Sequence, residues 1–401
     1  MNLHISLSLL LLAPATAAPP SEAVIIERLL LKLHAHGIPM DIPSLLHDDG
    51  QKPLSSPSVG NTEDAANSSK QDYLDFRFSQ RTGRESAQGQ SRAHSFPLIT
   101  GDGFRMFADV VIDETADDWQ SHSWCASIHG RNNEPVIVFV KTDLLSHFFL
   151  SGCFDRIQFP MVMISHNSDN EFPMRAQAPY LDDSRIIAWF AQNCAVLHPK
   201  LICIPIGLEN RMYGPPAITG SHGNTPEVIL EHMESFFIQR GLSNALACFN
   251  PSTHSTRSDL ISMLSRAQTA GQATWVSFGC EQKRSIPDLY KIMLDHAAII
   301  CPRGNGLDTH RMWETLYLGR VAIALHSALD PLFKDLPVVL LNSWDELLTA
   351  EPQVLAMAEM PVSKGARDKL FLPYWLCLIG KAASREAEFC SKRALLAKLQ
   401  N

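Results

Sequence analysis

The stretch of sequence that decides the fold is 301–319, which reads CPRGNGLDTHRMWETLYLG. It continues the apolar run AAIIC, which is typical of a short buried strand. Gly304 and Gly306 come next and lack a Cβ atom, so the backbone there can turn sharply and approach other groups closely. The order of these residues predicts a strand that ends in a tight loop. An ordinary turn at Gly-Asn-Gly is the alternative interpretation.

A helix is predicted directly after this loop, over 309–318. Asp308 or Thr309 can cap its first turn, and Gly319 can end it. The N-terminus of the helix would then lie at the carboxyl end of a strand. Backbone N–H groups and the helix dipole make such a position suitable for an anion.

The predicted helix has a polar face and an apolar face. At about 100° per residue, His310, Arg311 and Glu314 fall within about a quarter turn of one another. The apolar side chains of the same helix are Met312, Trp313 and Leu316. One face can pack on the sheet while the other presents an acid, a base and an imidazole to a ligand.

These polar residues suit a phosphorylated ligand. Arg303 and Arg311 can neutralise a diphosphate, because the guanidinium fork matches phosphate oxygens. Glu314 can accept hydrogen bonds from ribose hydroxyls. For Arg311 and Glu314 the alternative is a solvated ion pair at the i,i+3 spacing.

Short apolar runs alternate with helical patterns along the rest of the chain, which is typical of parallel sheets covered by helices. In the first series, strands are expected at 136–140, 161–164 and 201–206, and helices at 184–193 and 228–239. Asp143 is expected to cap the helix that follows the first of these strands.

A second series follows. Strands are expected at 245–249, 275–278, 298–301, 321–325 and 338–341, and helices at 257–267, 286–296, 309–318 and from 345 onward. The fold class predicted by the two series is α/β, with two Rossmann-like lobes and a cleft between them. The lobes are expected over 96–242 and 243–369, with helices over 370–401, and ligands at the carboxyl ends of the strands.

The stretch 301–319 resembles the donor-binding lobe of exostosin-type glycosyltransferases, closest to the ribitol xylosyltransferase-like proteins and their algal and microbial relatives. The shared pattern is S/C-P-R-G-N-G-x-D-T-H-R-x-W-E-x-L-Y-x-G, and it is complete here. Three further runs resemble the family, at 139–143, 164–169 and 204–211, so that the resemblance covers roughly 101–346.

The resemblance implies a GT-B fold and transfer of a hexose or pentose from a nucleotide sugar, with UDP as the expected nucleotide. The acceptor would be a glycan, a glycoprotein or another hydroxyl compound, bound by the N-terminal lobe. GT-B enzymes generally need no metal for their chemistry, so no cofactor is expected. The residues expected at the donor site are Arg257, Arg303, Gly304, Asn305, Gly306, Asp308, His310, Arg311 and Glu314.

This sequence departs from the family at one place. Relatives continue G-x-I-P-I-V after the helix, whereas 319–324 reads GRVAIA and lacks the proline. The strand is expected to survive, and the loop beyond it is expected to differ.

Inverting transfer needs a base that takes the proton of the acceptor hydroxyl. His166 and Asp169 follow the strand at 161–164 and are the candidates. The alternative is a loop held by the turn chemistry of Asn and Asp. Asp102 and Arg105 are expected in another loop at the same cleft.

Arg257 follows the first strand of the second lobe, together with Asn250 and His254. A helix N-terminus at this place can meet a phosphate group. The alternative is simple helix capping by the neighbouring serine and threonine residues.

The N-terminus predicts a signal peptide over 1–17, with an apolar run followed by Ala15-Thr16-Ala17. The run is shorter than the ~20 residues that span a bilayer. It lacks Lys and Arg on its N-terminal side, so an uncleaved start is the alternative. A signal implies the Golgi or ER lumen or secretion, and its absence the cytoplasm.

The segment 18–95 is expected to contain one helix, over 22–36, and then a poorly ordered polar stem or linker. Asn67 begins an N-glycosylation sequon within this stem, which would make the protein a glycoprotein.

The composition excludes some functions. A net charge of −8 argues against a general nucleic-acid binder, and no segment beyond the N-terminus is typical of a membrane helix. The 9 cysteines form no C-x-x-C pair, and no Cys/His spacing is typical of zinc. One or two disulfides are expected if the protein is secreted.

Two other classes of function compete with this prediction. A catalytically inactive nucleotide- or sugar-binding protein of the same fold would keep the donor residues and lack a base in the first lobe. A Rossmann-type oxidoreductase is disfavoured, because no G-x-G-x-x-G follows an early strand with an acid about 20 residues later.

Overall fold

The computed structural model describes residues 95–114, 130, 134–210, 228–229, 241–280, 284–391 and 395, all of which belong to one compact unit of the chain. The predicted signal peptide, the stem with its sequon and the helix over 22–36 lie outside the described residues, as does most of the helix expected over 228–239.

Five parallel strands form the first sheet and lie in the order of the chain. They are β1 (Val110–Ile112), β2 (Val136–Lys141), β3 (Met161–His166), β4 (Ile186–Ala191) and β5 (Leu201–Cys203). β2 and β3 are buried along almost their whole length, as expected for parallel strands covered on both faces. The strands predicted at 136–140 and 161–164 are confirmed.

Two expectations for this half of the chain are wrong. The segment 184–193 is not a helix but contains β4, whose β-branched and aromatic residues suit a buried strand. Short apolar runs do not distinguish the two structures by periodicity. Asp143 does not cap a helix either: it lies in the short helix η2 (Thr142–Leu144), and its carboxylate accepts hydrogen bonds from Ser168 and Asn170.

The second sheet also has five parallel strands, in the order β10-β9-β8-β6-β7. They are β6 (Ala245–Ala247), β7 (Val276–Phe278), β8 (Ala298–Ile300), β9 (Val321–Leu325) and β10 (Val338–Leu341). All five were predicted, and the missing proline at 319–324 leaves β9 intact.

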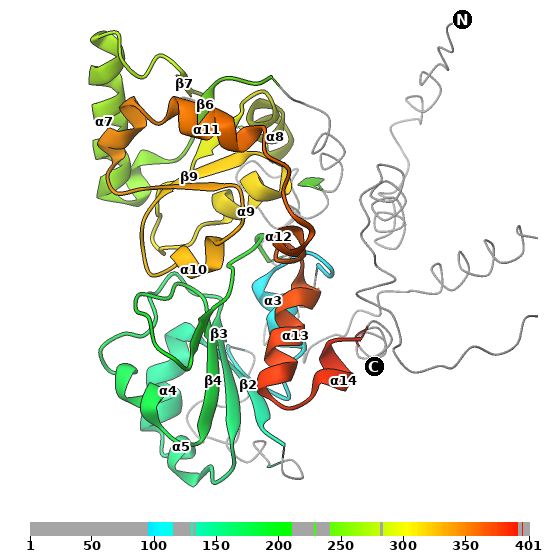
Figure 1. The fold of residues 1–401 in the computed structure, drawn as a ribbon. Coiled ribbons are helices and arrows are strands. Elements are labelled where there is room, and N and C mark those ends of the chain that lie inside the picture. The colour runs from blue at the N-terminus through cyan, green and yellow to red at the C-terminus, as the bar shows by residue number, and fades with distance from the viewer. Residues whose placement is uncertain are drawn as a thin grey trace, which may run out of the picture. The chain divides into compact units, whose positions relative to one another are not determined.

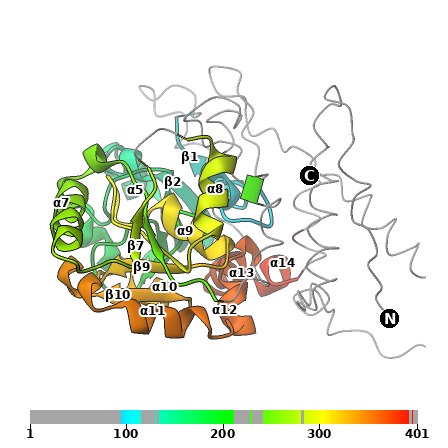
Figure 2. The same cartoon turned by 90° about the horizontal axis from the view of Figure 1, so that it is seen from above.

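Helices lie between these strands and after the last of them. They are α7 (Ser255–Thr269), α8 (Ile286–Leu294), α9 (His310–Tyr317), α10 (Asp330–Phe333) and α11 (Glu351–Ala358), with the short helices η6 (Pro251–Thr253) and η7 (Trp344–Leu348). α7 and α8 lie on opposite sides of β7 (Figures 1 and 2).

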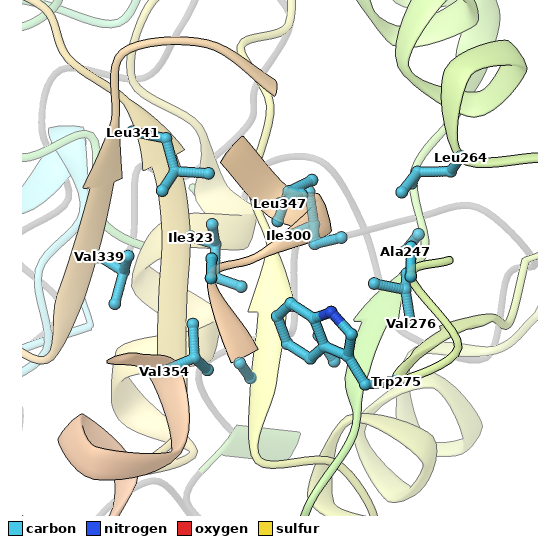
Figure 3. Packing of buried hydrophobic residues seen from close by; sticks show 14 of the residues in the cluster. Ala247, Leu264, Trp275, Val276, Ile300, Ile323, Val339, Leu341, Leu347 and Val354 are labelled. Carbon is cyan, nitrogen blue, oxygen red and sulfur yellow. The ribbon is translucent and has the colours of Figure 1, made fainter. Parts of the chain in front are cut away.

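One face of the second sheet is covered by α7 and α11. Leu264 of α7 and Val354 of α11 are fully buried and belong to one apolar cluster with Ile300 and Ile323 of the central strands. Trp275, which precedes β7, fills the space between them (Figure 3). The cluster holds α7 against the sheet and so fixes the position of the first turn of that helix.

Seven further helices belong to the described residues. They are α3 (Gly101–Met106), α4 (Leu145–Leu150), α5 (Cys153–Arg156), η3 (Ala178–Asp182), α12 (Lys364–Asp368), α13 (Leu372–Ala382) and α14 (Glu386–Phe389). Among them, α3, α4, α13 and η3 contact strands of the first sheet. α4 and α13 lie on opposite sides of strands β2 to β4 (Figure 1).

The chain returns to the first sheet at its C-terminal end. α13 packs against α3 and β4, and Leu372 donates a backbone hydrogen bond of 2.9 Å to Pro97. Arg385 anchors the following turn through ion pairs of 2.6 Å to Asp109 and 2.7 Å to Glu388. The helices expected after residue 370 therefore complete the first lobe.

Disulfides are more numerous than the one or two expected. Three join described residues: Cys194–Cys203, Cys248–Cys280 and Cys377–Cys390. Cys153 is also disulfide-bonded, and Cys301 is free and buried. The cysteines in apolar runs thus serve mostly as cross-links in this fold.

The observed architecture is α/β with two five-stranded parallel sheets, which is compatible with two Rossmann-like lobes. Within the part of the chain that the structure describes, no helix has the length and apolarity needed to cross a membrane.

Candidate functional site

The candidate site lies where the strand order of the second sheet reverses. β6 and β8 are neighbours, but the chain leaves β6 toward β7 on one side and leaves β8 toward β9 on the other. In doubly wound sheets, ligands bind outside the carboxyl ends of the strands at such a switch point. The segments that follow β6 and β8, 248–254 and 301–309, are therefore the expected source of ligand-binding groups.

Arg257 connects these two segments. It lies in the first turn of α7 and is 9% exposed. Its guanidinium donates to three carbonyls: Nε to Arg303 at 2.8 Å, Nη2 to Pro302 at 3.1 Å and Nη1 to Asn250 at 3.3 Å. It forms no ion pair with any described residue, and two of the five N–H groups of a guanidinium remain for a ligand.

Arg311 approaches the same place from α9. Its Nη1 donates to the carbonyl of Cys248 at 2.9 Å, and its Nε donates to Glu314 Oε2 at 2.9 Å. The predicted alternative of an i,i+3 ion pair is therefore present, but it is not a solvated one, since the Glu314 side chain is only 3% exposed. Glu314 Oε1 has no hydrogen-bond partner among the described residues, which leaves it able to accept from a hydroxyl.

The two arginines lie close enough for their charges to interact. Burial, and after it the positive charge of Arg311, lowers the pKa of Arg257. An arginine nevertheless stays charged, so two cations lie at this place and Glu314 pairs with one of them, Arg311. A buried charge without an opposite partner is costly, and a negative ligand would remove that cost. The pair therefore favours an anionic ligand.

The loop leaves little room for a side chain at its two glycines. A Cβ atom on Gly304 would lie 3.1 Å from Arg257 Nη2, and one on Gly306 would lie 2.6 Å from Asn193 Nδ2. The close approach expected of both glycines is confirmed, and it brings the loop against protein side chains. Gly319 has φ +65° and ends α9, as predicted.

Asp308 forms hydrogen bonds within the protein. Its buried carboxylate accepts hydrogen bonds from the backbone of Ile206 at 2.8 Å and of Thr309 at 2.9 Å, and from Trp313 Nε1 at 2.9 Å. Burial raises the pKa of Asp308 to about 6, although these bonds oppose the rise. Asp308 therefore ties the start of α9 to the segment after β5, and this geometry gives it a positioning role. Thr309 is the N-cap by backbone conformation, without a side-chain bond.

His310 contacts the same segment of the first lobe. Its Nδ1 lies 2.8 Å from the carbonyl of Gly207, and its Nε2 lies 3.3 Å from Glu209 Oε2. Burial alone would lower the pKa of His310, but the charge and hydrogen bond of Glu209 and the carbonyl of Gly207 outweigh it and raise the pKa to about 9. The imidazole is thus a cation at neutral pH, paired with the carboxylate of Glu209.

The His310 contact makes stability depend on pH. Histidine titrates near 6.5 in the unfolded chain and near 9 in this fold, so the stabilisation is complete below pH 6.5 and is lost as pH rises through 9. We expect His310→Gln to lower the melting temperature by about 2–4 °C at pH 6, the scale of ~1 kcal/mol, and by clearly less at pH 9.5. Thermal unfolding of both proteins at the two pH values checks this, and an equal difference at both would contradict it.

Two loop residues contact the segment after β3. Arg303 Nη1 lies 2.9 Å from Glu171 Oε1, and Asn305 Nδ2 donates to Asp169 Oδ2 at 3.0 Å. Arg303 also donates to the carbonyl of Asn305 at 3.1 Å. Asp169, a candidate base, therefore lies beside this loop.

The surroundings of His166 do not suit a general base, which needs a ring nitrogen open to the substrate. It is 1% exposed, its Nε2 lies 3.0 Å from the carbonyl of Pro205, and its Nδ1 accepts from the backbone of Asn167 at 2.8 Å. Burial lowers the pKa of His166 to about 4, so the ring is neutral. With both nitrogens engaged, His166 supports the loop, and Asp169, which is exposed, is the better placed of the two candidates.

Sequence reasoning missed one residue that holds the site together. Asn193 is fully buried with φ +55°, and its side chain accepts from the backbone of Asp308 at 2.8 Å and donates to the carbonyl of Ser168 at 3.1 Å. Asparagine is enriched at positive φ, but no local pattern in the sequence indicates which asparagine adopts it.

Other expectations need correction. Asp102 and Arg105 lie in α3, not in a loop, and Arg105 pairs with Asp113 at 2.5 Å. The cap of α7 is none of the serine or threonine side chains considered: His254 Nδ1 accepts from the backbone of Thr256 at 3.2 Å.

Comparison with protein-family models finds no match for this chain, and comparison with curated proteins finds none. Its function has to be inferred from the site. Within the described part of the chain, no group of three or more His, Cys, Asp or Glu side chains is arranged to hold a metal ion.

Proposed function

We propose that this protein is a glycosyltransferase that moves a hexose or pentose from a nucleotide-sugar donor, most simply a UDP-sugar, to a hydroxyl group of a glycan or other acceptor. The observation that carries the proposal is the proximity of Arg257 and Arg311 at the switch point of the second sheet, where among the described residues only Arg311 has a carboxylate partner, Glu314. Arginine forks bind phosphate oxygens with two parallel hydrogen bonds.

The reaction assigns a role to each group. The bond between the anomeric carbon and the diphosphate oxygen breaks, and the nucleoside diphosphate leaves with the bonding electrons. Arg257, Arg303 and Arg311 would stabilise the negative charge that develops on it. Glu314 Oε1 would accept from a ribose hydroxyl. The acceptor oxygen bonds to the anomeric carbon, and its proton passes to a base, for which we propose Asp169.

A second candidate function is a binding protein of the same fold without catalysis. It is favoured by the state of the candidate bases, since His166 is buried and one Asp169 oxygen accepts from Asn305. Transfer or hydrolysis of a UDP-sugar by the purified protein would exclude it. Binding of UDP without any turnover would favour it.

The GT-B arrangement, the absence of an essential metal and a location in the secretory pathway belong to the same proposal. The disulfides among the described residues support the location, because such bonds persist in oxidising compartments. The resemblance to metal-independent enzymes supports the absence of an essential metal. Activity lost with EDTA and restored by manganese would contradict it.

The proposal predicts binding of a nucleoside diphosphate. We expect one of UDP, GDP and CDP, at about 100 times its Kd, to stabilise the protein by ~2.7 kcal/mol in a thermal-shift experiment, whereas NAD has no effect. Arg303→Ala should weaken that binding about tenfold, because this side chain is 30% exposed and its hydrogen bonds are partly replaced by water. A response to NAD alone would overturn the proposal.

A further inference from the structure

The segment after β3 carries two carboxylates that face the proposed donor loop. Glu171 pairs with Arg303 at 2.9 Å, and Asp169 accepts from Asn305 at 3.0 Å. We propose that Asp169 and Glu171 form a latch: they occupy the polar groups of the donor loop in the free protein, and the phosphates of the donor displace them. This inference rests on the proposed function and adds a regulation of its site.

Of the three arginines proposed to bind the donor, the latch pairs with the exposed one, Arg303. The side chains of Arg303 and Glu171 are 30% and 41% exposed. Such solvated ion pairs are weak, whereas a diphosphate offers several charged oxygens to the same guanidinium. Arg257 and Arg311 are instead held by carbonyls and by buried Glu314. The site therefore keeps its fixed cations, and Arg303 is the one that can change partners.

The segment is anchored behind the latch. Phe172 is fully buried, its ring centroid lies 4.5 Å from that of Trp189, and its backbone donates to Asn193 at 2.9 Å. The tip in front of it is exposed and is held by bonds from Ser168 and Asn170 to Asp143. Because the segment is fixed at Phe172 and exposed at 169–170, the two carboxylates can move without unfolding of the strand.

Release of the latch has a consequence for the reaction. In the free protein one oxygen of Asp169 accepts the amide of Asn305. When the donor takes over Asn305 and Arg303, that oxygen becomes available to accept the proton of the acceptor hydroxyl. Donor binding thus precedes the activation of Asp169 as a base.

The test compares UDP, GDP and CDP binding to wild type and to Glu171→Gln by calorimetric titration. The substitution removes the competing charge and keeps the shape, so we expect affinity for the bound nucleotide to rise about two- to fivefold, the scale of a solvated ion pair. The gain should vanish in the Arg303→Ala background, because the effect passes through that side chain. Asp155→Asn, an exposed site on α5 that precedes β3, is the matched control for net charge and should change nothing.

Each outcome has a distinct meaning. Unchanged or weaker binding by Glu171→Gln, with wild type binding normally, overturns the latch and leaves the proposed function intact. No binding by either protein overturns the proposed function and the latch with it.

Amide hydrogen exchange provides a second measurement on the unmodified chain. Bound nucleotide should speed exchange at 168–171 and slow it at 303–311. Protection of both segments would show that the carboxylates stay in place, and so would contradict their displacement.

Discussion

Arg257→Ala is expected to lower the affinity for the bound nucleoside diphosphate by about 10- to 100-fold, the loss that follows from removing a hydrogen bond of ~1.5–3 kcal/mol to a charged group. Its guanidinium is 9% exposed, lacks an ion pair among the described residues and donates to carbonyls of both ligand-binding segments. The substitution removes a charge that the phosphates would use and loosens the loop at Pro302 and Arg303.

Two further variants separate these contributions. Arg257→Lys keeps the charge and loses the planar fork, so an intermediate affinity is expected. Arg266→Ala removes an exposed arginine from the same helix and serves as the matched control. Isothermal titration at a temperature where all variants are folded provides the measurement. Wild-type affinity in folded Arg257→Ala would refute this placement of the site.

Asp308→Ala is expected to lower the free energy of unfolding by about 3 kcal/mol, because it leaves several buried donors without an acceptor. The donors are the backbone of Ile206 and Thr309 and the indole of Trp313. Asp308→Asn should cost less, since the amide oxygen can still accept while its NH₂ group faces a donor. Urea denaturation checks both variants.

The Asp308 prediction also has a pH dependence. Burial raises the pKa of Asp308 to about 6 from 3.8, so the folded state favours the protonated form. This contribution to stability is present below pH 3.8 and is lost as pH rises through 6. The cost of Asp308→Asn relative to wild type should therefore be larger at pH 4 than at pH 7. Exposed Asp345 is the control site, and a cost below ~0.5 kcal/mol for Asp308→Ala would contradict the positioning role.

The second lobe was the more predictable half of the chain. Its strands are apolar runs bounded by turn residues, and the glycines and polar face of 301–319 identify a loop and helix directly. The first lobe was less predictable from the sequence, because β4 combines an apolar run with residues that also fit a helix. Only the pairing of β4 with β3 and β5 makes it a strand.

The candidate site was predictable as a set of residues but not as a set of roles. The helical wheel separates Arg311 and Glu314 from the apolar face, and both are near the loop as expected. The wheel cannot show that Glu314 is buried beneath Arg311, since burial depends on what packs over the helix. It also cannot show that His166 is enclosed while Asp169 is exposed, although the two are close in sequence.

The sequence by itself determined the alternation of strands and helices in the second lobe and the loop and polar helix at 301–319. These features depend on local spacing and on backbone freedom, which a single segment carries. Only the tertiary structure decided that Arg257 has no carboxylate partner within the described part of the chain, that Asp308 and Asn193 join two segments and that Glu171 faces Arg303. These relations join residues far apart in the chain, and the strand order that brings them together is set by packing of the whole sheet.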